Sequence, residues 1–376
     1  MSDFILAPGT IQLNHGSFGG TPVAVMDAAE RWRREFEADP THFMRKRWAG
    51  EIAKSKAALA AFLNADPDGL VFVMNASEGA NAVLRSLAFA PGDEILTGSH
   101  GYRAVTKTVQ HVCAETGATH RIADISYPLT DDSAILAPIE AALSSRTRLI
   151  VIDHITSPTA AVMPVAKIQA MARLRGIPVL IDGAHAPGQV TLDLKTLDPD
   201  FYVGNCHKWL FAAKGAAFLS VAPRFRALVH PGTISHGYGQ GLAAEFDWVG
   251  TRDIGAWLSV PDGIAFGEKL GWAKLRARND GLIDQAVTLL ARRWGTRIGA
   301  PQGLRAHMGA VEIPLGGVAD EARAQKLWTR LHEAHRIQMP VIAFAGALWA
   351  RPSAQIYNAL PDYEALAKVD WAKLDG

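Results

Sequence analysis

Helical periodicity characterises the first part of the chain. Thr21-Pro22 is a typical helix start, because threonine can cap the first turn and proline fits the first helical position. We expect this helix to run to about Ala38 and to stop before Pro40, since proline interrupts a helix. A second helix, rich in alanine, leucine, lysine and glutamate, is expected over 48–64.

Short apolar runs of strand length alternate with helical stretches from residue 70 to residue 221. The apolar runs lie at 70–74, 94–97, 148–153, 178–182, 201–203 and 216–221. The helical stretches lie at about 78–89, 103–116 and 165–175. This alternation predicts an α/β fold with a mostly parallel sheet that is covered by helices on both faces.

The pattern changes from about Gly255 onward. A long helix is expected over 258–293, followed by an apolar run at 311–314, a helix near 319–335 and an apolar run at 339–344. This mixture indicates a smaller α+β unit. The expected organisation is an N-terminal segment at 1–20 that packs with the small domain, a large domain at 21–255 and a small C-terminal domain at 256–376.

Composition and charge narrow the class of protein. The 376 residues carry 38 Lys and Arg against 37 Asp and Glu, so the net charge is +1. A charge this close to zero gives none of the long-range positive field that favours nucleic acid or an anionic membrane. The longest apolar run, at 339–350, is shorter than the ~20 residues of a membrane-spanning helix.

The N-terminus lacks the pattern of a signal peptide, because Asp3 stands there and no basic segment precedes an apolar one. Two cysteines, Cys113 and Cys206, are too few for a disulfide framework. We therefore expect a cytoplasmic protein that binds a small molecule, with neither a nucleic acid nor a membrane as its partner.

Polar residues follow five of the expected strands, at the strand ends where an open parallel sheet binds its ligands. They lie at 75–79, 99–102, 153–157, 182–185 and 204–208. Each residue also has a structural interpretation: Asp182 can cap a turn, His185 can be an ordinary structural histidine, and Lys208 can lie on the surface. However, Trp-Leu-Phe follows Lys208, and burial among such residues makes an amine nucleophilic.

The strand-end residues indicate a function more specifically in combination than any one of them does alone. Ser77, at an expected helix start, either caps that helix or helps its backbone N–H groups to bind phosphate. A phosphate site, the acidic Asp182 and a lysine 26 residues later, Lys208, fit one cofactor. Pyridoxal phosphate needs a dianion site, a carboxylate on its pyridine nitrogen and an aldehyde-capturing lysine.

Two segments resemble the class V aminotransferase family of fold type I pyridoxal-phosphate enzymes. They are Asp-Gly-Ala-His-Ala-Pro-Gly-Gln at 182–189 and Gly-Asn-Cys-His-Lys-Trp-Leu at 204–210. Segments at 13–19, 154–159 and 351–358 are similar to the isopenicillin N epimerase-like branch. The resemblance covers about 13–367 and implies the fold type I architecture, a mostly parallel sheet between layers of helices with a smaller C-terminal α+β domain.

The resemblance implies a role for each matching position around the cofactor. Lys208 would form the Schiff base, Asp182 would pair with the protonated pyridine nitrogen, and His185 would contact the ring hydroxyl. Tyr102, with His100 as the alternative, would stack on the ring. The phosphate would be held by Ser77, Glu78, Gly79, Asn205 and His207.

Substrate contacts and a partner subunit are implied in the same way. Arg351 would bind the α-carboxylate of an amino acid through its planar fork. Ser157 stands where related enzymes place a residue near the substrate or the ring hydroxyl, and Asn14 and His15 belong to the substrate side. Thr251 matches a segment that reaches the phosphate from a partner subunit, so the resemblance implies a homodimer with a shared active site.

The chain departs from the family pattern at two places. Related cysteine desulfurases carry a cysteine on a loop shortly before the carboxylate-binding arginine, whereas 344–349 contains none. Persulfide transfer is therefore not expected. Gly101 stands between His100 and Tyr102 where the branch leads us to expect an acidic residue, which weakens the assignment of the ring-face contact.

The reaction type depends on where the α-proton goes after Lys208 removes it. Its return to the opposite face gives epimerisation and needs a second acid, for which His15, Tyr102 and His236 are candidates. Protonation of the cofactor gives transamination, and loss of a β-substituent gives a lyase. We expect an epimerase, racemase or C–S lyase acting at the α-carbon of an amino acid, with a true aminotransferase as the alternative.

Two readings of another class compete. Strand-end carboxylates and imidazoles could be ligands of a metal-dependent hydrolase, namely Asp153, His154, Asp182, His185 and His207. That interpretation leaves Lys208, Ser77 and Arg351 unexplained, so we expect no metal. A non-catalytic sensor or scaffold with this fold is the third possibility, which the full set of cofactor ligands disfavours.

Overall fold

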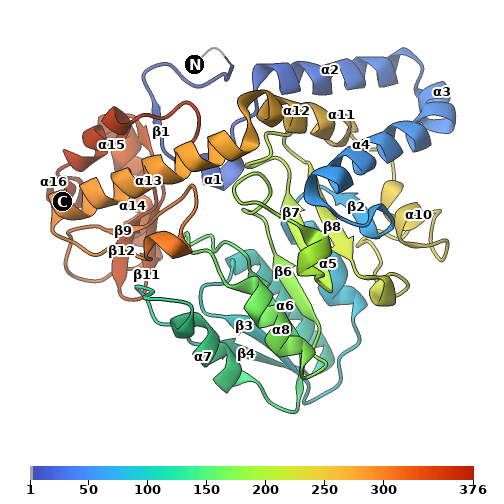
Figure 1. Cartoon of the computed structure of the whole chain (residues 1–376), viewed down its shortest axis with the longest axis horizontal. Coiled ribbons are helices and arrows are strands. Elements are labelled where there is room, and N and C mark those ends of the chain that lie inside the picture. Colours follow the sequence, from blue (N-terminus) through green and yellow to red (C-terminus); the bar gives the residue numbers. More distant parts are fainter. Residues whose placement is uncertain (1–2) are drawn as a thin grey trace.

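A seven-stranded sheet forms the centre of the molecule, whose computed structural model describes residues 3–376 (Figure 1). The strand order is β2-β8-β7-β6-β5-β3-β4, and β8 alone runs antiparallel to its neighbours. The predicted α/β class with a mostly parallel sheet is therefore confirmed. The strands are β2 Leu70–Val73, β3 Glu94–Gly98, β4 Thr119–Ala123, β5 Thr147–Asp153, β6 Val179–Asp182, β7 Phe201–Asn205 and β8 Ala217–Val221.

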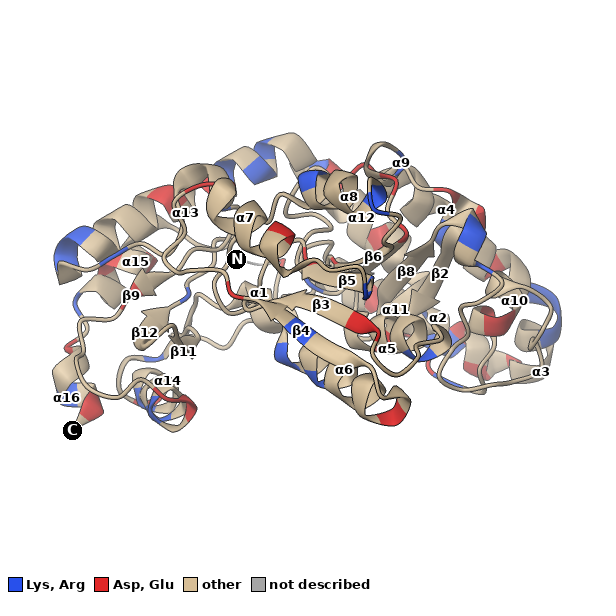
Figure 2. Cartoon of the chain, turned by 90° about the horizontal axis from the view of Figure 1, so that it is seen from below, with Lys and Arg blue, Asp and Glu red and all other residues tan. Residues whose placement is uncertain are grey.

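Helices cover both faces of this sheet, as Figure 2 shows. Helices α7 (Ser133–Ala142) and α8 (Val165–Arg173) lie on one face, and α5 (Ala76–Ser86) and α6 (Arg103–Thr116) lie on the other. The short helices α9 (Leu194–Leu197) and α10 (Leu242–Asp247) lie in connecting segments.

Alternate residues of each strand supply the two cores, because successive side chains of a strand point to opposite faces. In β5, Ile150 and Ile152 belong to the core under α7 and α8. Leu149 and Val151 belong to the core under α5 and α6. All four side chains are buried, which explains why this strand reads as a continuous apolar run in the sequence.

The N-terminal helices differ from the prediction at Pro40. Helix α2 (Val23–Ala38) ends where expected, but Asp39 then accepts a hydrogen bond from the His42 backbone N–H at 3.0 Å and caps a new turn. Proline fits the first position of that turn. The chain continues through α3 (Pro40–His42) and the π-helical 43–47 into α4 (Trp48–Leu63).

The C-terminal part contains helices and two small sheets. The long helix expected over 258–293 is divided into three, because Gly271 adopts a φ of 78° that ends α12 and Ser259 separates α11 from α12. The helices are α11 Gly255–Leu258, α12 Val260–Leu270, α13 Trp272–Trp294, α14 Glu321–His335, α15 Leu360–Ala367 and α16 Trp371–Asp375. An antiparallel sheet, ordered β11-β12-β9, contains β11 Val341–Phe344, β12 Ala347–Ala350 and β9 Val311–Glu312.

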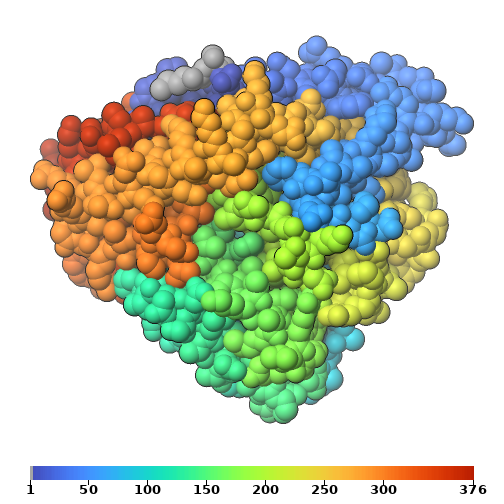
Figure 3. Space-filling view, viewed as in Figure 1, coloured from blue at the N-terminus to red at the C-terminus, as the bar shows by residue number. Residues whose placement is uncertain are grey.

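The first residues of the chain pack against the C-terminal part. Strand β1 (Ile11–Gln12) pairs in parallel with β10 (Ile337–Gln338), and α1 (His15–Phe18) follows it. Leu13 is fully buried in the C-terminal core. Figure 3 shows the N-terminal surface, in blue, directly beside the orange and red C-terminal surface.

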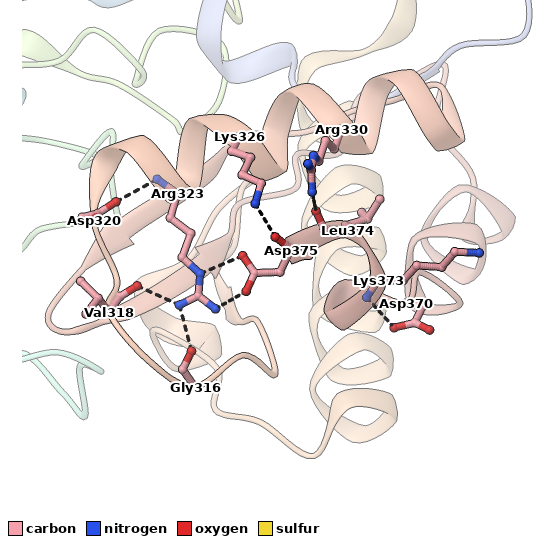
Figure 4. Close-up of polar contacts among 10 residues, drawn as sticks. All are labelled: Gly316, Val318, Asp320, Arg323, Lys326, Arg330, Asp370, Lys373, Leu374 and Asp375. Carbon is pink, nitrogen blue, oxygen red and sulfur yellow. Dashed lines mark hydrogen bonds and ion pairs between the residues drawn. The ribbon is translucent and has the colours of Figure 1, made fainter.

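Ion pairs fasten the last helix to α14 (Figure 4). Arg323 donates to both carboxylate oxygens of Asp375, at 2.9 and 2.5 Å, and to the carbonyls of Gly316 and Val318. Arg330 donates to the Leu374 carbonyl at 2.8 Å. Helix α14 is therefore held along one side by the end of the chain.

The surface mixes charges of both signs. Figure 2 shows basic and acidic residues interspersed along the helices, in line with the net charge of +1. Within residues 3–376, no helix has both the length and the apolar character needed to cross a membrane.

Candidate active site

A cavity of about 660 Å³ opens at the carboxyl ends of the central strands. The expected site residues that line it share one feature, since each ends a strand, lies in the segment that follows a strand, or lies in the first turn of the next helix. They are Ser77, Tyr102, Ser157, Asp182, His185, Asn205, His207 and Lys208. Segments far apart in the sequence thus meet where an open parallel sheet binds its ligands.

Lys208 lies beside His185 in this cavity. Its Nζ is 3.2 Å from His185 Nε2, while Trp209 Nε1 donates to His185 Nδ1 at 3.4 Å. Because the indole N–H can only donate, the neutral His185 ring carries its hydrogen on Nε2, facing the lysine. Burial lowers the pKa of Lys208 to about 8, against the raising effect of Asp182. The amine is therefore a better nucleophile near neutral pH than a surface lysine.

Asp182 presents a carboxylate oxygen that lacks a partner. Its Oδ1 accepts from the Ala184 backbone N–H at 3.0 Å, but its Oδ2 is buried and has no hydrogen-bond partner among the described residues. Burial raises the pKa of this carboxyl group. A buried, unpaired acceptor on the cavity wall fits a protonated ring nitrogen, which would supply the missing donor.

Asp153 is a second carboxylate of the cavity, which the sequence analysis considered only as a metal ligand. It ends β5 directly beside Asp182 at the end of β6. Burial, followed by the neighbouring Asp182, raises the pKa of Asp153 well above its usual value. The strand-end position was visible in the sequence, but the pairing of β5 with β6 was not.

The first turn of α5 lies where the phosphate of the cofactor is expected. Asn205 Oδ1 accepts from the Ala76 backbone N–H at 2.9 Å, which joins the end of β7 to the start of α5. Nδ1 of His207 donates to the Ala216 carbonyl at 2.9 Å, and burial lowers the pKa of His207 to about 4. Ser77 lies in the same turn and lines the cavity. The N-terminus of α5 therefore faces the cavity, which is the arrangement by which a helix binds an anion.

Glu78 and Gly79 do not line this cavity. The Glu78 carboxylate accepts from the Met74 backbone N–H, and Asn75 Oδ1 accepts from the Glu78 N–H at 2.9 Å. Gly79 faces β7, where a Cβ atom would lie 2.8 Å from a methyl group of Val203. The first residue stabilises the helix start and the second allows close helix–strand packing.

Arg351 lies directly after β12 and lines an adjoining cavity that shares Ser17, Tyr102 and Ser157 with this one. Its guanidinium donates to the Ser157 carbonyl and lies 3.3 Å from both Ser157 Oγ and Ser17 Oγ. Nε is buried and lacks a partner within residues 3–376, and burial lowers the pKa of the group to about 10. A substrate carboxylate would satisfy the remaining donors.

Ser17 connects the N-terminal segment to this arginine, although the sequence analysis did not single it out. Its hydroxyl donates to Asn14 Oδ1 at 2.6 Å and is within reach of Arg351. Asn14 thus lies one contact away from the arginine rather than in the cavity lining. The available signal in the sequence was the place of Ser17 within the segment at 13–19, which carries part of the family resemblance.

Three of the expected aromatic or histidine contacts lie elsewhere. His15 is fully engaged, with Nδ1 2.9 Å from the Tyr357 hydroxyl and Nε2 3.0 Å from the Lys208 carbonyl, and it does not line the cavity. His100 is buried between Thr159 and the Ile125 carbonyl. His236 is exposed on a loop outside the cavity. Tyr102 is the one of these candidates that faces the cavity.

Thr251 lies outside the cavity of its own chain. It lines a separate depression with Met44 and Trp48, and its side chain is exposed. Phe18 and Met74, at the mouth of the main cavity, are exposed apolar side chains. Within one chain, then, Thr251 contributes nothing to the site.

The competing metal interpretation finds no ligand set. Over the part of the chain that the structure describes, no three His, Cys, Asp or Glu side chains form a group that could hold a metal ion. His154, one of the candidate ligands, instead lies 2.8 Å from the Tyr202 hydroxyl through Nδ1. The donors that are present, an amine, an unpaired carboxylate and a helix start, fit pyridoxal phosphate.

Comparisons with known proteins give the same picture. The chain is 34% identical to a putative L-cysteine desulfhydrase 1 from Oryza sativa subsp. japonica, covering 95% of this chain and 82% of that protein. It is 32% identical to isopenicillin N epimerase from Streptomyces clavuligerus, covering 96% and 94%. A solved structure of a C-DES mutant, with glycine covalently linked to its PLP cofactor, has a TM-score of 0.79 at 21% identity, covering 98% and 97%.

The family model for class V aminotransferases matches residues 19–359, which include every cavity-lining site residue except Ser17 and Phe18. Its extent covers the whole central sheet and most of the C-terminal part. Together with the relatives above 30% identity, this match identifies the fold and the cofactor class. The chain belongs to the class V aminotransferase family of pyridoxal-phosphate-dependent enzymes.

Proposed function

We propose that the protein is a C–S lyase that removes the β-substituent of a cysteine-type amino acid. The observation that carries this proposal is the position of Lys208 in one cavity with Asp182, while Arg351 lines the adjoining cavity. The cofactor supplies an electron sink for the charge that develops when the α-proton leaves. Loss of the proton and of the thiolate then yields an enamine, which water converts to pyruvate and ammonia.

Each residue has one task in this scheme. Lys208 Nζ would hold the cofactor and afterwards take the α-proton, because burial lowers its pKa to about 8. Asp182 Oδ2 holds the proton on the ring nitrogen. Arg351 orients the substrate through its carboxylate.

Elimination is favoured over epimerisation because it needs a single base. Epimerisation requires a second acid on the opposite face, and His15 and His236 are outside the cavity. Four of the relatives are named as L-cysteine desulfhydrases or probable ones, which also supports a lyase. Epimerisation stays the second candidate because Tyr102 lines the cavity and could deliver the second proton.

Persulfide transfer has no nucleophile to support it. Strands β11 and β12 are joined by the two residues Ala345 and Gly346, so no loop stands before Arg351 to carry a cysteine. Cys113 and Cys206 are both buried, and burial raises the pKa of each thiol. Such thiols are unreactive, since the thiolate is the nucleophilic form.

A homodimer with a shared site is part of the proposal. Phe18 and Met74 expose apolar surface at the cavity mouth, and Thr251 lies away from the cavity of its own chain. A second copy would cover that surface and bring its own Thr251 to the phosphate end. Light scattering of the purified protein measures the mass directly, and a monomer at micromolar concentration would contradict this part.

The reaction is tested by a panel of L- and D-amino acids with the purified, cofactor-loaded protein. We expect pyruvate, ammonia and a thiol from cysteine derivatives, with Lys208→Ala inactive. Interconversion of enantiomers without pyruvate would establish the epimerase instead. A stoichiometric keto acid that carries the intact side chain would establish the aminotransferase.

A further inference from the structure

A second cavity, of about 810 Å³, continues the first one past Arg351. Its walls are α14 and β11 on one side and the turns at 99–103 and 157–158 on the other. The two cavities share Ser17, Tyr102 and Ser157. Arg351 lines the second cavity and lies 3.3 Å from both Ser17 Oγ and Ser157 Oγ. A substrate whose carboxylate reaches Arg351 therefore stands at the junction of the two spaces.

One wall of this second cavity, which we call the cleft, is apolar and partly aromatic. Trp328 of α14 and Phe344 of β11 are half-buried there, next to Val341 and Ile342. Phe344 is held edge-on against His100, with ring centroids 4.7 Å apart. Half-buried aromatic side chains on a concave wall are typical of sites that bind apolar groups.

Apart from Arg351, the charged residues of the cleft already have hydrogen-bond partners. Arg103 bonds the Glu321 carboxylate at 2.5 and 2.6 Å, and Asp320 accepts from the Arg323 backbone N–H at 2.8 Å. Arg351 is held by Ser157 and by Ser17. A charged substituent would have to displace one of these partners, whereas an uncharged one would not.

The cleft wall is also rigid on both of its elements. Ala345 and Gly346 make a two-residue turn with φ of 47° and 74°, so β11 and β12 form a tight hairpin between Phe344 and Arg351. Helix α14 is fastened from its other side by Asp375 and Leu374 (Figure 4). The cleft is thus preformed rather than the track of a mobile loop.

We propose that the cleft is the binding site for the substrate side chain and selects cysteine derivatives with a long, uncharged, apolar substituent on sulfur over free cysteine. With the carboxylate at Arg351 and the amine toward Lys208, the substituent lies between Trp328, Phe344 and Tyr102. The inference rests on the proposed function, because the orientation of the substrate comes from Lys208 and Arg351.

The test compares how tightly L-cysteine and S-benzyl-L-cysteine bind to the cofactor-loaded protein. Binding is measured by the change in visible absorption of the cofactor that an added amino acid causes. We expect the benzyl derivative to bind at least tenfold more tightly, and S-carboxymethyl-L-cysteine to bind no better than cysteine. Trp328→Ala should reduce the benzyl preference to below about threefold while leaving the affinity for cysteine unchanged.

Trp294→Ala is the matched control, since Trp294 is a half-buried tryptophan of the same C-terminal core that does not line the cleft. It should retain the preference. If Trp328→Ala does not fold, Trp328→Leu takes its place, and the preference of the wild type is measured in either case. Equal affinities for cysteine and the benzyl derivative, or an equal loss in both tryptophan variants, would overturn the inference.

Failure of the proposed function has a different signature. If no amino acid changes the absorption, then the assignment of the site itself is wrong. If amino acids change the absorption but none yields pyruvate and thiol, then the lyase assignment is wrong. If cysteine changes the absorption and is cleaved but the benzyl derivative gains nothing, then the lyase assignment survives and the cleft inference alone is lost.

Discussion

Asp153 and Asp182 are register partners at the ends of the neighbouring parallel strands β5 and β6, and both are buried against the same cavity. Two carboxylates so close together cannot both be ionised where water is excluded. Because burial and the neighbouring Asp182 raise the pKa of Asp153 well above its usual value, we expect Asp153 to keep its proton and Asp182 to carry the charge.

The first prediction separates the two carboxylates by amide substitution. Asp182→Asn should weaken cofactor binding by roughly 10- to 150-fold, the equivalent of about 1.5–3 kcal/mol for a hydrogen bond to a charged group. Asp153→Asn replaces a neutral acid by a neutral amide and should change the affinity by less than about threefold. Equilibrium dialysis of pyridoxal phosphate measures both, and equal losses would show that both groups are ionised.

Lys208→Ala should abolish the covalent attachment of the cofactor while the fold survives. The visible band of the cofactor-loaded wild type should be absent, and borohydride should fix no cofactor to the variant. Lys214→Ala is the control, because Lys214 also lines the cavity but its Nζ lies 2.9 Å from Thr21 Oγ1. Borohydride fixation in Lys208→Ala but not in Lys214→Ala would move the assignment to Lys214.

Covalent capture of the cofactor should depend on pH with a midpoint near 8. Only the neutral amine attacks an aldehyde, and burial lowers the pKa of Lys208 to about 8 from 10.5. The rate should therefore rise as pH increases through 8 and then level off. Borohydride trapping at timed intervals, with protein stripped of cofactor, gives this profile; a rate that still rises beyond pH 10 would indicate an ordinary surface lysine.

Arg351→Lys should raise KM for amino acids at least tenfold, which corresponds to about 1.4 kcal/mol. Lysine cannot offer the planar pair of donors that the guanidinium offers a carboxylate. Cofactor content and its absorption should stay unchanged. An amino-acid amide, which lacks the carboxylate, serves as the control: if its KM rises as much as that of the acid, Arg351 acts on the fold instead.

Ala345→Gly should stabilise the protein. Ala345 has a φ of 47° in the turn between β11 and β12, and its side chain is exposed, so the substitution removes strain without removing packing. Left-handed geometry costs an L-residue roughly 1–2 kcal/mol. Glycine avoids this cost but loses more conformational entropy on folding, which offsets part of the gain. We expect the free energy of unfolding, measured by thermal denaturation, to rise by about 0.5–1 kcal/mol. The control Ala347→Gly, in β12, should lower it.

The central fold was predictable because its strands are buried on both faces. β5 and β6 read as apolar runs that end in aspartate, and their order along the chain fixed a parallel sheet. Strand β4 was missed, since it lies at the sheet edge and its residues Thr-His-Arg-Ile-Ala are mostly polar or partly exposed. Helix α7 was missed as well, with Pro138 inside it.

The site was predictable where a residue's type and its strand-end position both pointed to the cavity, as for Asp182 and Lys208. Roles that depend on side-chain direction were not. Glu78 turns back to its own helix start, and His15 turns toward Tyr357, because each finds a backbone or side-chain partner there. Ser17 was missed because only the folded chain brings residues 17 and 351 together.

The parallel pairing of β1 with β10 has a consequence for biosynthesis. Ile337 is made more than three hundred residues after its partner Ile11. The central sheet can form while the chain is still growing, because domains fold as units from the N-terminus. The N-terminal segment must wait, and so must the contact between Ser17 and Arg351. The substrate end of the site can therefore be completed only after Arg351 has been made, 334 residues after Ser17.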